Sequence, residues 1–341
     1  MAVRKDTNFL EDRTPDVNKI ENMYGLVNQL GLFEETGVRT RTFQYDQIES
    51  GFSLPEDRMW GSRRDQFVDK GIVKTFSFSI PHFPFDGRIM PEDVQSQRAP
   101  GTDQEFSSFD AKVAEELLRI NNSWAQLREW SRLQLIKDGT VYAPNGTVST
   151  NYFTDLGVTQ KVVDYDIDTG GTGVPQAKSE EVIAYIQDNL QDGMIVTDFI
   201  SLDSPEFFAK LTTNTNVKEA YSQFAATNAN GNFLRDRLPT VGRGHRTFVD
   251  QAGILHIEYR GQMKGTPLIP AGEARIIPMV SGLFKTIYAP MSHNSYVNTV
   301  GVPMYAFVYE NDRGQGYDIE TESNFAHFCA KPQLIVKATI T

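Results

Sequence analysis

The sequence predicts an α+β fold in which one long helix is combined with many short, mostly antiparallel strands. Apolar residues recur at steps of three and four over about residues 107–137, which is typical of a helix. Elsewhere the apolar residues form short runs rich in β-branched and aromatic side chains, bounded by glycine, proline and aspartate. These runs do not alternate regularly with helical patterns, so a parallel βαβ architecture is not expected.

The first 45 residues are polar and mixed in character. Scattered apolar positions between Ile20 and Phe33 could form a short helix, but they do not supply a core of their own. We expect an extended N-terminal arm with one docking segment.

Residues 46–100 follow as a β-rich segment. Lys74 to Ile80 alternates polar and apolar residues, and Asp69-Lys70-Gly71 is a turn signal, so a long β-hairpin is expected. The segment is rich in charge and poor in apolar mass, so it should rest on another surface. Trp60 in this projection is a plausible anchor on a neighbouring subunit. The candidate subunit-contact residues are Met59, Trp60, Arg63, Arg64 and Phe67.

A long helix is predicted next. Ser107 and Ser108 offer N-cap hydroxyls, the apolar stripe begins at Val113, and Asp138-Gly139 ends the pattern. At 1.5 Å per residue such a helix is about 45 Å long, so it should act as a spine.

The remainder of the chain mixes helices and strands. We expect a strand over residues 160–168, a helix capped by Ser179, a strand over 194–200, and a helix starting at Ser204-Pro205. Further strands are expected at 246–249, 254–259, 274–280, 286–291, 304–309 and 334–341.

Motifs for metal or cofactor chemistry are weak. Asp164, Asp166 and Asp168 open like a calcium loop, but Pro175 stands where such a loop needs a glutamate, so a solvated strand face is favoured. The five histidines are scattered, and Cys329, the single cysteine, lies in an apolar strand and is read as a core thiol. We expect no cofactor and no metal.

Charge and targeting signals also limit the function. The formal charge of −11 disfavours binding of nucleic-acid backbone as the main role, and the glycine-rich basic stretch at 242–246 lacks the remainder of a P-loop. No apolar run reaches the roughly 20 residues of a membrane span, and no apolar signal segment follows the N-terminus. We expect a protein that stays in the cytoplasm where it is made and has no membrane partner.

The last third of the sequence resembles the lambda-like phage major capsid protein E family. The resemblance lies in the stretches at residues 265–279, 288–291, 320–324 and 331–338. Upstream, the order of arm, hairpin, spine helix and two-part body is similar in layout. The resemblance implies the major capsid shell fold of tailed phages and herpesviruses.

The same resemblance implies a division of the chain into five segments. These are an N-terminal arm (1–45), an extended loop (46–100), a peripheral domain with the spine helix (101–175), an axial domain (176–299) and a return to the peripheral domain (300–341). It implies a non-enzymatic subunit that assembles with itself into hexamers, pentamers and an icosahedral head around double-stranded DNA. The first hundred or so residues, polar and poorly supplied with core residues, are then expected to find their stabilising contacts on neighbouring copies.

Partners and location follow from that implication. Scaffolding, portal and decoration proteins are further candidate partners, while packaged DNA is expected to make only weak, non-specific contact. The expected location is the virion capsid, with the host cytoplasm as the place of assembly.

Two other classes of function remain open from the residues. One is a hydrolase-type enzyme that uses His245 or His256 with Asp250 or Glu258, which would require a pocket with converging polar groups. The other is a different virion component, such as a tail-tube or decoration protein, although the spine helix argues against it.

Overall fold

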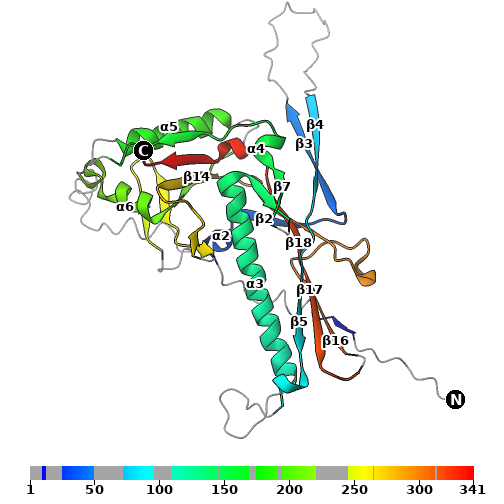
Figure 1. The fold of residues 1–341 in the computed structure, drawn as a ribbon. Coiled ribbons are helices and arrows are strands. Elements are labelled where there is room, and N and C mark those ends of the chain that lie inside the picture. Colours follow the sequence, from blue (N-terminus) through cyan, green and yellow to red (C-terminus); the bar gives the residue numbers. More distant parts are fainter. Residues whose placement is uncertain are drawn as a thin grey trace, which may run out of the picture.

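The computed structural model describes residues 10–12, 25–49, 72–95, 109–143, 146–168, 174–190, 194–219, 245–263, 265–311 and 313–341. Within them it contains the predicted mixture of helices and strands around one long helix (Figure 1). The helices are α2 (Leu26–Gln29), α3 (Phe109–Asp138), α4 (Tyr152–Asp155), α5 (Pro175–Asn189) and α6 (Pro205–Thr213). None of the described helices combines the length and the apolar character needed to cross a bilayer.

The largest sheet has six strands in the order β10-β11-β9-β14-β19-β8. Its strands are β10 (Thr247–Val249), β11 (Ile254–Glu258), β9 (Asp198–Asp203), β14 (Glu273–Met279), β19 (Val336–Thr339) and β8 (Val162–Asp164). α6 packs against β9, β11 and β14, and α5 packs beside β8. The sheet therefore joins strands from three of the expected segments, and the proposed division at 175/176 and 299/300 does not follow sheet membership.

A second sheet has four strands in the order β1-β16-β17-β5, and a third has three in the order β18-β15-β2. The second contains β1 (Leu10–Asp12), β16 (Tyr305–Glu310), β17 (Tyr317–Glu322) and β5 (Pro84–Ile89). The third contains β18 (Asn324–Cys329), β15 (Phe284–Ala289) and β2 (Phe33–Gly37). Smaller two-stranded pairs are β3 (Thr42–Glu49) with β4 (Ile72–Ser79), β6 (Thr140–Tyr142) with β7 (Val148–Asn151), and β12 (Gln262–Met263) with β13 (Thr266–Pro267).

The spine helix α3 connects two separate cores. Its N-terminal half presents Val113, Leu117 and Trp124 to the four-stranded sheet. Its last turns bury Leu133 and Ile136 in the larger core, which contains the six- and three-stranded sheets and the hairpin root. The prediction of a spine is confirmed, and Figure 1 shows α3 running from the main body down along β5.

The end of the spine requires a glycine. Gly139 has φ of 64°, the left-handed conformation in which glycine ends helices, and its N–H donates to the Leu135 carbonyl at 2.9 Å. A Cβ at this position would lie 2.6 Å from the Phe153 ring. The predicted stop at Asp138-Gly139 therefore has both a conformational and a steric cause.

The arm is held to its own chain more closely than expected. Glu129 on the spine accepts hydrogen bonds from the Val27 and Asn28 amides at 3.0 and 2.9 Å and so caps α2. Burial raises the pKa of this carboxyl, although those amides favour its ionised form. The next strand, β2, pairs in parallel with β15. The expectation that the first hundred residues depend on neighbouring copies is therefore wrong for α2 and β2, and also for β5, which pairs with β17.

Two details of the predicted helices and strands also change. Ser179 is not an N-cap: α5 starts at Pro175, and the buried Ser179 hydroxyl lies 3.1 Å from that of Tyr165. The strand expected at 194–200 is β9 at Asp198–Asp203. Ser204 does cap α6, because its hydroxyl accepts the Phe207 amide at 3.3 Å, as expected from Ser-Pro at a helix start.

Candidate functional site

The β3–β4 hairpin is the most prominent projection of the described chain (Figure 1). The strands pair antiparallel without a bulge, from Thr42 opposite Ser79 to Glu49 opposite Ile72. The predicted hairpin is therefore confirmed over these residues. It rises from the body at the point where β18 and α4 meet the base of its strands.

The root of the hairpin is fixed by aromatic packing. Phe43 and Phe78 face each other across the pair with ring centroids 5.4 Å apart, and both are buried. Phe43 also contacts the Phe328 ring at 5.4 Å, and Phe78 contacts the Tyr152 ring at 5.1 Å. Burial of each phenylalanine contributes about 1.5–3 kcal/mol, so the root is a rigid part of the body.

Burial then falls along the hairpin. Tyr45 and Phe76 are only partly buried, and Val73, Lys74 and Thr75 are exposed. Beyond Tyr45 and Phe76, the side chains that the structure describes on the hairpin, Asp46 and Val73 to Thr75, are thus open to solvent. A two-stranded ribbon without a packed face is marginal in water, so this part of the hairpin is suited to contact with another surface.

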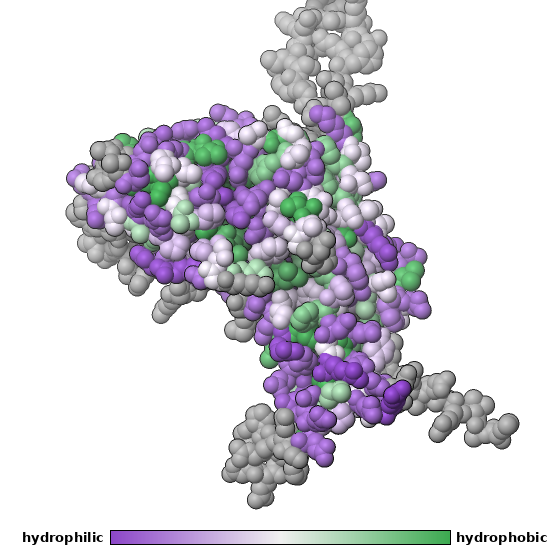
Figure 2. Space-filling view, in the orientation of Figure 1, coloured by the Kyte–Doolittle hydropathy of each residue, from purple (hydrophilic) through white to green (hydrophobic). Residues whose placement is uncertain are grey.

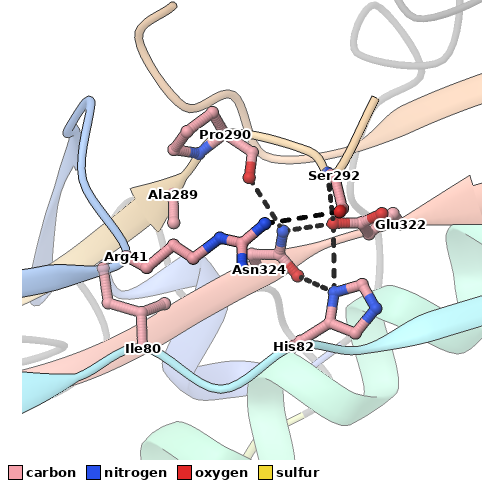
Figure 3. A pocket seen from close by; sticks show the side chains of 8 residues that line it. All are labelled: Arg41, Ile80, His82, Ala289, Pro290, Ser292, Glu322 and Asn324. Atoms are coloured by element: carbon pink, nitrogen blue, oxygen red, sulfur yellow. Dashed lines mark hydrogen bonds and ion pairs between the residues drawn. The ribbon is translucent and has the colours of Figure 1, made fainter. Parts of the chain in front are cut away.

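A pocket of about 190 Å³, lined by both polar and apolar side chains, lies beside the hairpin root (Figure 3). Arg41 and Ile80 come from the ends of the hairpin, and Glu322 and Asn324 come from the junction of β17 and β18. The full lining is Arg41, Ile80, His82, Ala289, Pro290, Ser292, Glu322 and Asn324.

Side chains at this pocket tie the hairpin to two sheets. The buried Glu322 carboxylate accepts from the Ser292 amide at 3.2 Å and lies 3.1 Å from Nδ1 of His82. Asn324 accepts from the Phe83 amide at 3.3 Å and donates to the Pro290 carbonyl at 3.1 Å. His82 Nδ1 is also 3.0 Å from the Asn324 amide oxygen, so a proton on Nδ1 satisfies both acceptors. The pocket sets the exit of β4 from the body by hydrogen bonds rather than by apolar packing alone.

The candidate contact residues from the sequence lie outside the described residues. Met59, Trp60, Arg63, Arg64 and Phe67 all fall between Glu49 and Ile72. Their role stays a prediction. Neither Arg41 nor Glu322 was singled out from the sequence, because residues 281 positions apart reveal no pocket without the fold.

The alternative catalytic cluster around His256 is present but closed. His256 Nδ1 lies 2.8 Å from Asp203 and Nε2 lies 3.7 Å from Asp250, and the imidazole has 0% exposed surface. Burial alone would lower the pKa of His256, but the Asp203 and Asp250 carboxylates outweigh it and raise the pKa to about 10. His245 is exposed, and Glu258 pairs with arginines instead. The strands hold this histidine as a buried cation, with none of its surface exposed to a substrate in the described part of the chain.

The other candidate chemical groups are also structural. Cys329 is buried on β18, and burial raises the pKa of its thiol to about 12, which matches the predicted core thiol. Val163 and Tyr165 are buried while Asp164 and Asp166 are not, which matches the predicted solvated strand face. Within the described ranges, no group of three or more His, Cys, Asp or Glu side chains is placed to hold a metal ion.

Comparison with known proteins gives one consistent result. Residues 13–340 match the family described as phage major capsid protein E. The chain is 36% identical to the major capsid protein of Pseudomonas phage KPP10, with 96% of this chain and 95% of the relative covered. It is 26% identical to the major capsid protein of Salmonella phage Felix O1, again over 96% and 95% of the two chains.

Solved structures give the same fold. A chain of the mature capsid of bacteriophage PhiM1 matches with a TM-score of 0.53 at 13% identity, covering 91% of this chain and 85% of that one. At this identity the likeness concerns the fold alone, which is the shell fold expected from the sequence.

Proposed function

The chain belongs to the phage major capsid protein E family, and from this premise we propose that it assembles into hexamers and pentamers of an icosahedral head that encloses double-stranded DNA. The observation that carries the proposal is the match over residues 13–340, together with the shell fold. The protein is thus a structural component of the virion. Its assembly in the host cytoplasm belongs to the proposal.

The hairpin gives this assembly a mechanism. Its root is buried in the body, while the side chains that the structure describes beyond the root are open to solvent. Within the extended loop expected at residues 46–100, β5 stays paired with β17 of its own chain. We assign the part of this loop beyond the hairpin root to contact with a neighbouring subunit, with Trp60, Met59, Phe67, Arg63 and Arg64 as its contact candidates. Heterologous contacts of this kind close into rings, and rings close into a shell.

The five-segment division of the chain remains part of the proposal. The cores around the two ends of α3 support two units, a peripheral one at the four-stranded sheet and an axial one at the six-stranded sheet, although β8 and β19 join the latter from segments assigned to the peripheral domain. Scaffolding, portal and decoration proteins are proposed partners, and the formal charge of −11 supports only weak, non-specific contact with packaged DNA.

Assembly of the purified chain tests the function. Expressed alone and examined by negative-stain electron microscopy and analytical ultracentrifugation, it should form capsomers, sheets or closed shells. A chain that sediments as a small species across protein concentration, salt and pH, with no such assemblies, would contradict the proposal.

A further inference from the structure

Opposite edges of the six-stranded sheet carry opposite charge at the same level. Arg246 immediately precedes β10, and its carbonyl accepts the Glu258 amide at 2.9 Å. The same row of paired residues continues across the sheet through Asp203, Ala274 and Ala338 to Val163 on β8, which directly precedes Asp164. Five strand spacings of about 4.8 Å place the two edges roughly 24 Å apart. In Figure 1, α5 marks the β8 edge at the top, and the yellow strands β10 and β11 lie on the other side of β14.

The β10–β11 edge is cationic and preorganised. The Glu258 carboxylate is 2% exposed and pairs with Nη1 of Arg246 at 3.4 Å and with Nη2 of Arg260 at 2.6 Å. The two arginine side chains are 61% and 68% exposed, and the guanidinium of Arg246 stands 5.1 Å over the Phe208 ring. One buried carboxylate therefore holds two guanidinium groups in place and leaves net positive charge with donors directed to solvent.

The β8 edge is anionic on both faces. Asp164 follows buried Val163 on β8, so it points away from the face on which α5 packs, and Asp166, just beyond the strand, is exposed. Among the described residues neither aspartate has an ion-pair partner. α5 adds the exposed Glu180 on the other face.

Lys161 and Lys178 lie near this edge, and in the described part of the chain neither forms an ion pair with Asp164, Asp166 or Glu180. Lys161 is already engaged with Glu181 at 3.1 Å. The edge thus presents carboxylates that the described chain does not neutralise.

We propose that the Arg246–Arg260 edge of one copy receives the Asp164–Glu180 edge of a second copy, side by side in the capsomer ring. The two edges differ, so the contact is heterologous, and a heterologous contact that turns by a constant angle closes into a ring. The inference rests on the proposed function and deepens it by naming the contact.

The charge of the chain indicates that the partner of the cationic edge is a second copy of the same protein. With a formal charge of −11, its surface supplies carboxylates in excess, so a cationic edge meets its complement on another copy. Single exposed ion pairs contribute little, but a ring repeats the contact in every subunit.

Charge reversal in matched pairs tests the contact. Arg246→Glu, Asp164→Lys and Glu180→Lys should each lower the yield of capsomers and shells by about tenfold, since like charges then face each other at every joint. An equimolar mixture of Arg246→Glu with an acidic-edge variant should restore hexamers to within about threefold of wild type, because the two chains can alternate in a ring of six. A ring of five cannot alternate two chains, so pentamers keep one mismatched joint and closed shells should recover less than hexamers. Mass spectrometry of the recovered hexamers should find the two chains in equal amounts.

Arg88→Glu is the matched control. Arg88 is also half exposed and pairs with a carboxylate, that of Asp318 at 3.1 Å, so the charge change is the same. Mixing it with the acidic-edge variants should restore nothing. Circular dichroism and thermal unfolding should show that the variants fold like wild type. In Arg246→Glu, Arg260 still pairs with buried Glu258, and Asp164→Lys does not change that cluster.

The possible results distinguish failure of the proposed edge-to-edge contact from failure of the proposed capsid function. If the reversed variants assemble like wild type, or if Arg246→Glu is rescued by neither acidic-edge variant, this contact is wrong while the capsid assignment stands. If wild type itself forms no assembly, the proposed function fails and the contact fails with it.

Discussion

At the residue scale, His256 shows how the sheet tolerates buried charge. It lies between the carboxylates of Asp203 and Asp250 with no exposed surface, and the Ser201 hydroxyl donates to Asp203. A cation between two anions offsets part of their desolvation, so removal of the cation is expected to cost more than removal of a surface pair. The triad is a stabilising element of the same sheet that carries the charged edges.

The pH dependence of stability follows from this triad. The pKa of His256 is raised to about 10, so its contribution is fully present below about 6.5 and is lost as the pH rises through 10. Burial tends to raise the pKa of Asp250, but His256 outweighs it and lowers that pKa, so the contribution of Asp250 is lost only in acid. The unfolding free energy of wild type, measured by urea titration, should therefore decrease steadily from about pH 6.5 to 10.

His256→Gln removes the cation and keeps similar volume. At pH 7 this variant should lose about 3–5 kcal/mol of unfolding free energy, and its stability should vary less with pH in the alkaline range. Urea titrations of both proteins at several pH values provide the measurement. Parallel pH curves for the two proteins would show that His256 is not the titrating group.

The sequence could suggest these residues but not their arrangement. His256, Asp250 and Glu258 were candidates for catalysis because they lie close in sequence, yet Asp203, 53 positions away, is the direct partner of His256. Alternation along β11 gives the face on which His256 lies, whereas the neighbouring strand β9 is known only from the pairing. Local patterns fix local exposure and leave long-range partners undetermined.

At the element scale, the hairpin separates into a root and a projection. The root residues Phe43 and Phe78 belong to the main core, and Ile80 and Phe83 are also buried, so removal of the whole segment would damage the body. Glu49 lies directly opposite Ile72. A two-residue Asn-Gly turn can therefore replace residues 50–71 without disturbing the register.

This shortened chain should fold but fail to build shells, because the root keeps its aromatic packing while the proposed contact segment is gone. Thermal unfolding should change by only a few degrees, and electron microscopy should find no closed particles. An insertion variant that carries a Gly/Ser linker of 22 residues in place of 50–71 controls for loop length. Closed shells from either variant would show that residues 50–71 are dispensable for assembly.

Element prediction succeeded where the signal is local. The spine has its periodic stripe and glycine stop, and α6 has its Ser-Pro start, so both were placed closely. β5 and β17 were missed, because Pro84–Ile89 contains proline and glycine and Tyr317–Glu322 is half acidic. These strands are specified by pairing with each other and by the cover of α3, which no window of sequence contains.

At the scale of the whole molecule, assembly should change the protection of backbone amides. In dissociated subunits, amides at residues 46–49 and 72–75 should exchange with solvent much faster than those near Phe43 and Phe78, because burial falls along the hairpin. In shells the outer amides should become protected. Hydrogen exchange followed by mass spectrometry can compare the two states, and equal exchange rates would contradict contact of the hairpin with neighbours.

The architecture was predictable from resemblance, and the attachment of the arm was not. The polar composition of residues 1–45 suggested an arm that depends on other subunits, yet Glu129 and Arg132 of the spine hold α2 and β2 by hydrogen bonds. Composition measures the apolar mass available for a core. It does not register buried polar partners located a hundred residues away.

The parallel pairing of β2 with β15 also affects when this part of the protein can fold during translation. Phe33 lies opposite Phe284, so an early strand has to wait for a partner made 251 residues later. At about 5–20 residues per second, a ribosome needs roughly 13–50 s to cover that interval. The sheet that contains β2 therefore cannot be completed until most of the polypeptide has left the ribosome, and this part of the fold forms late in translation.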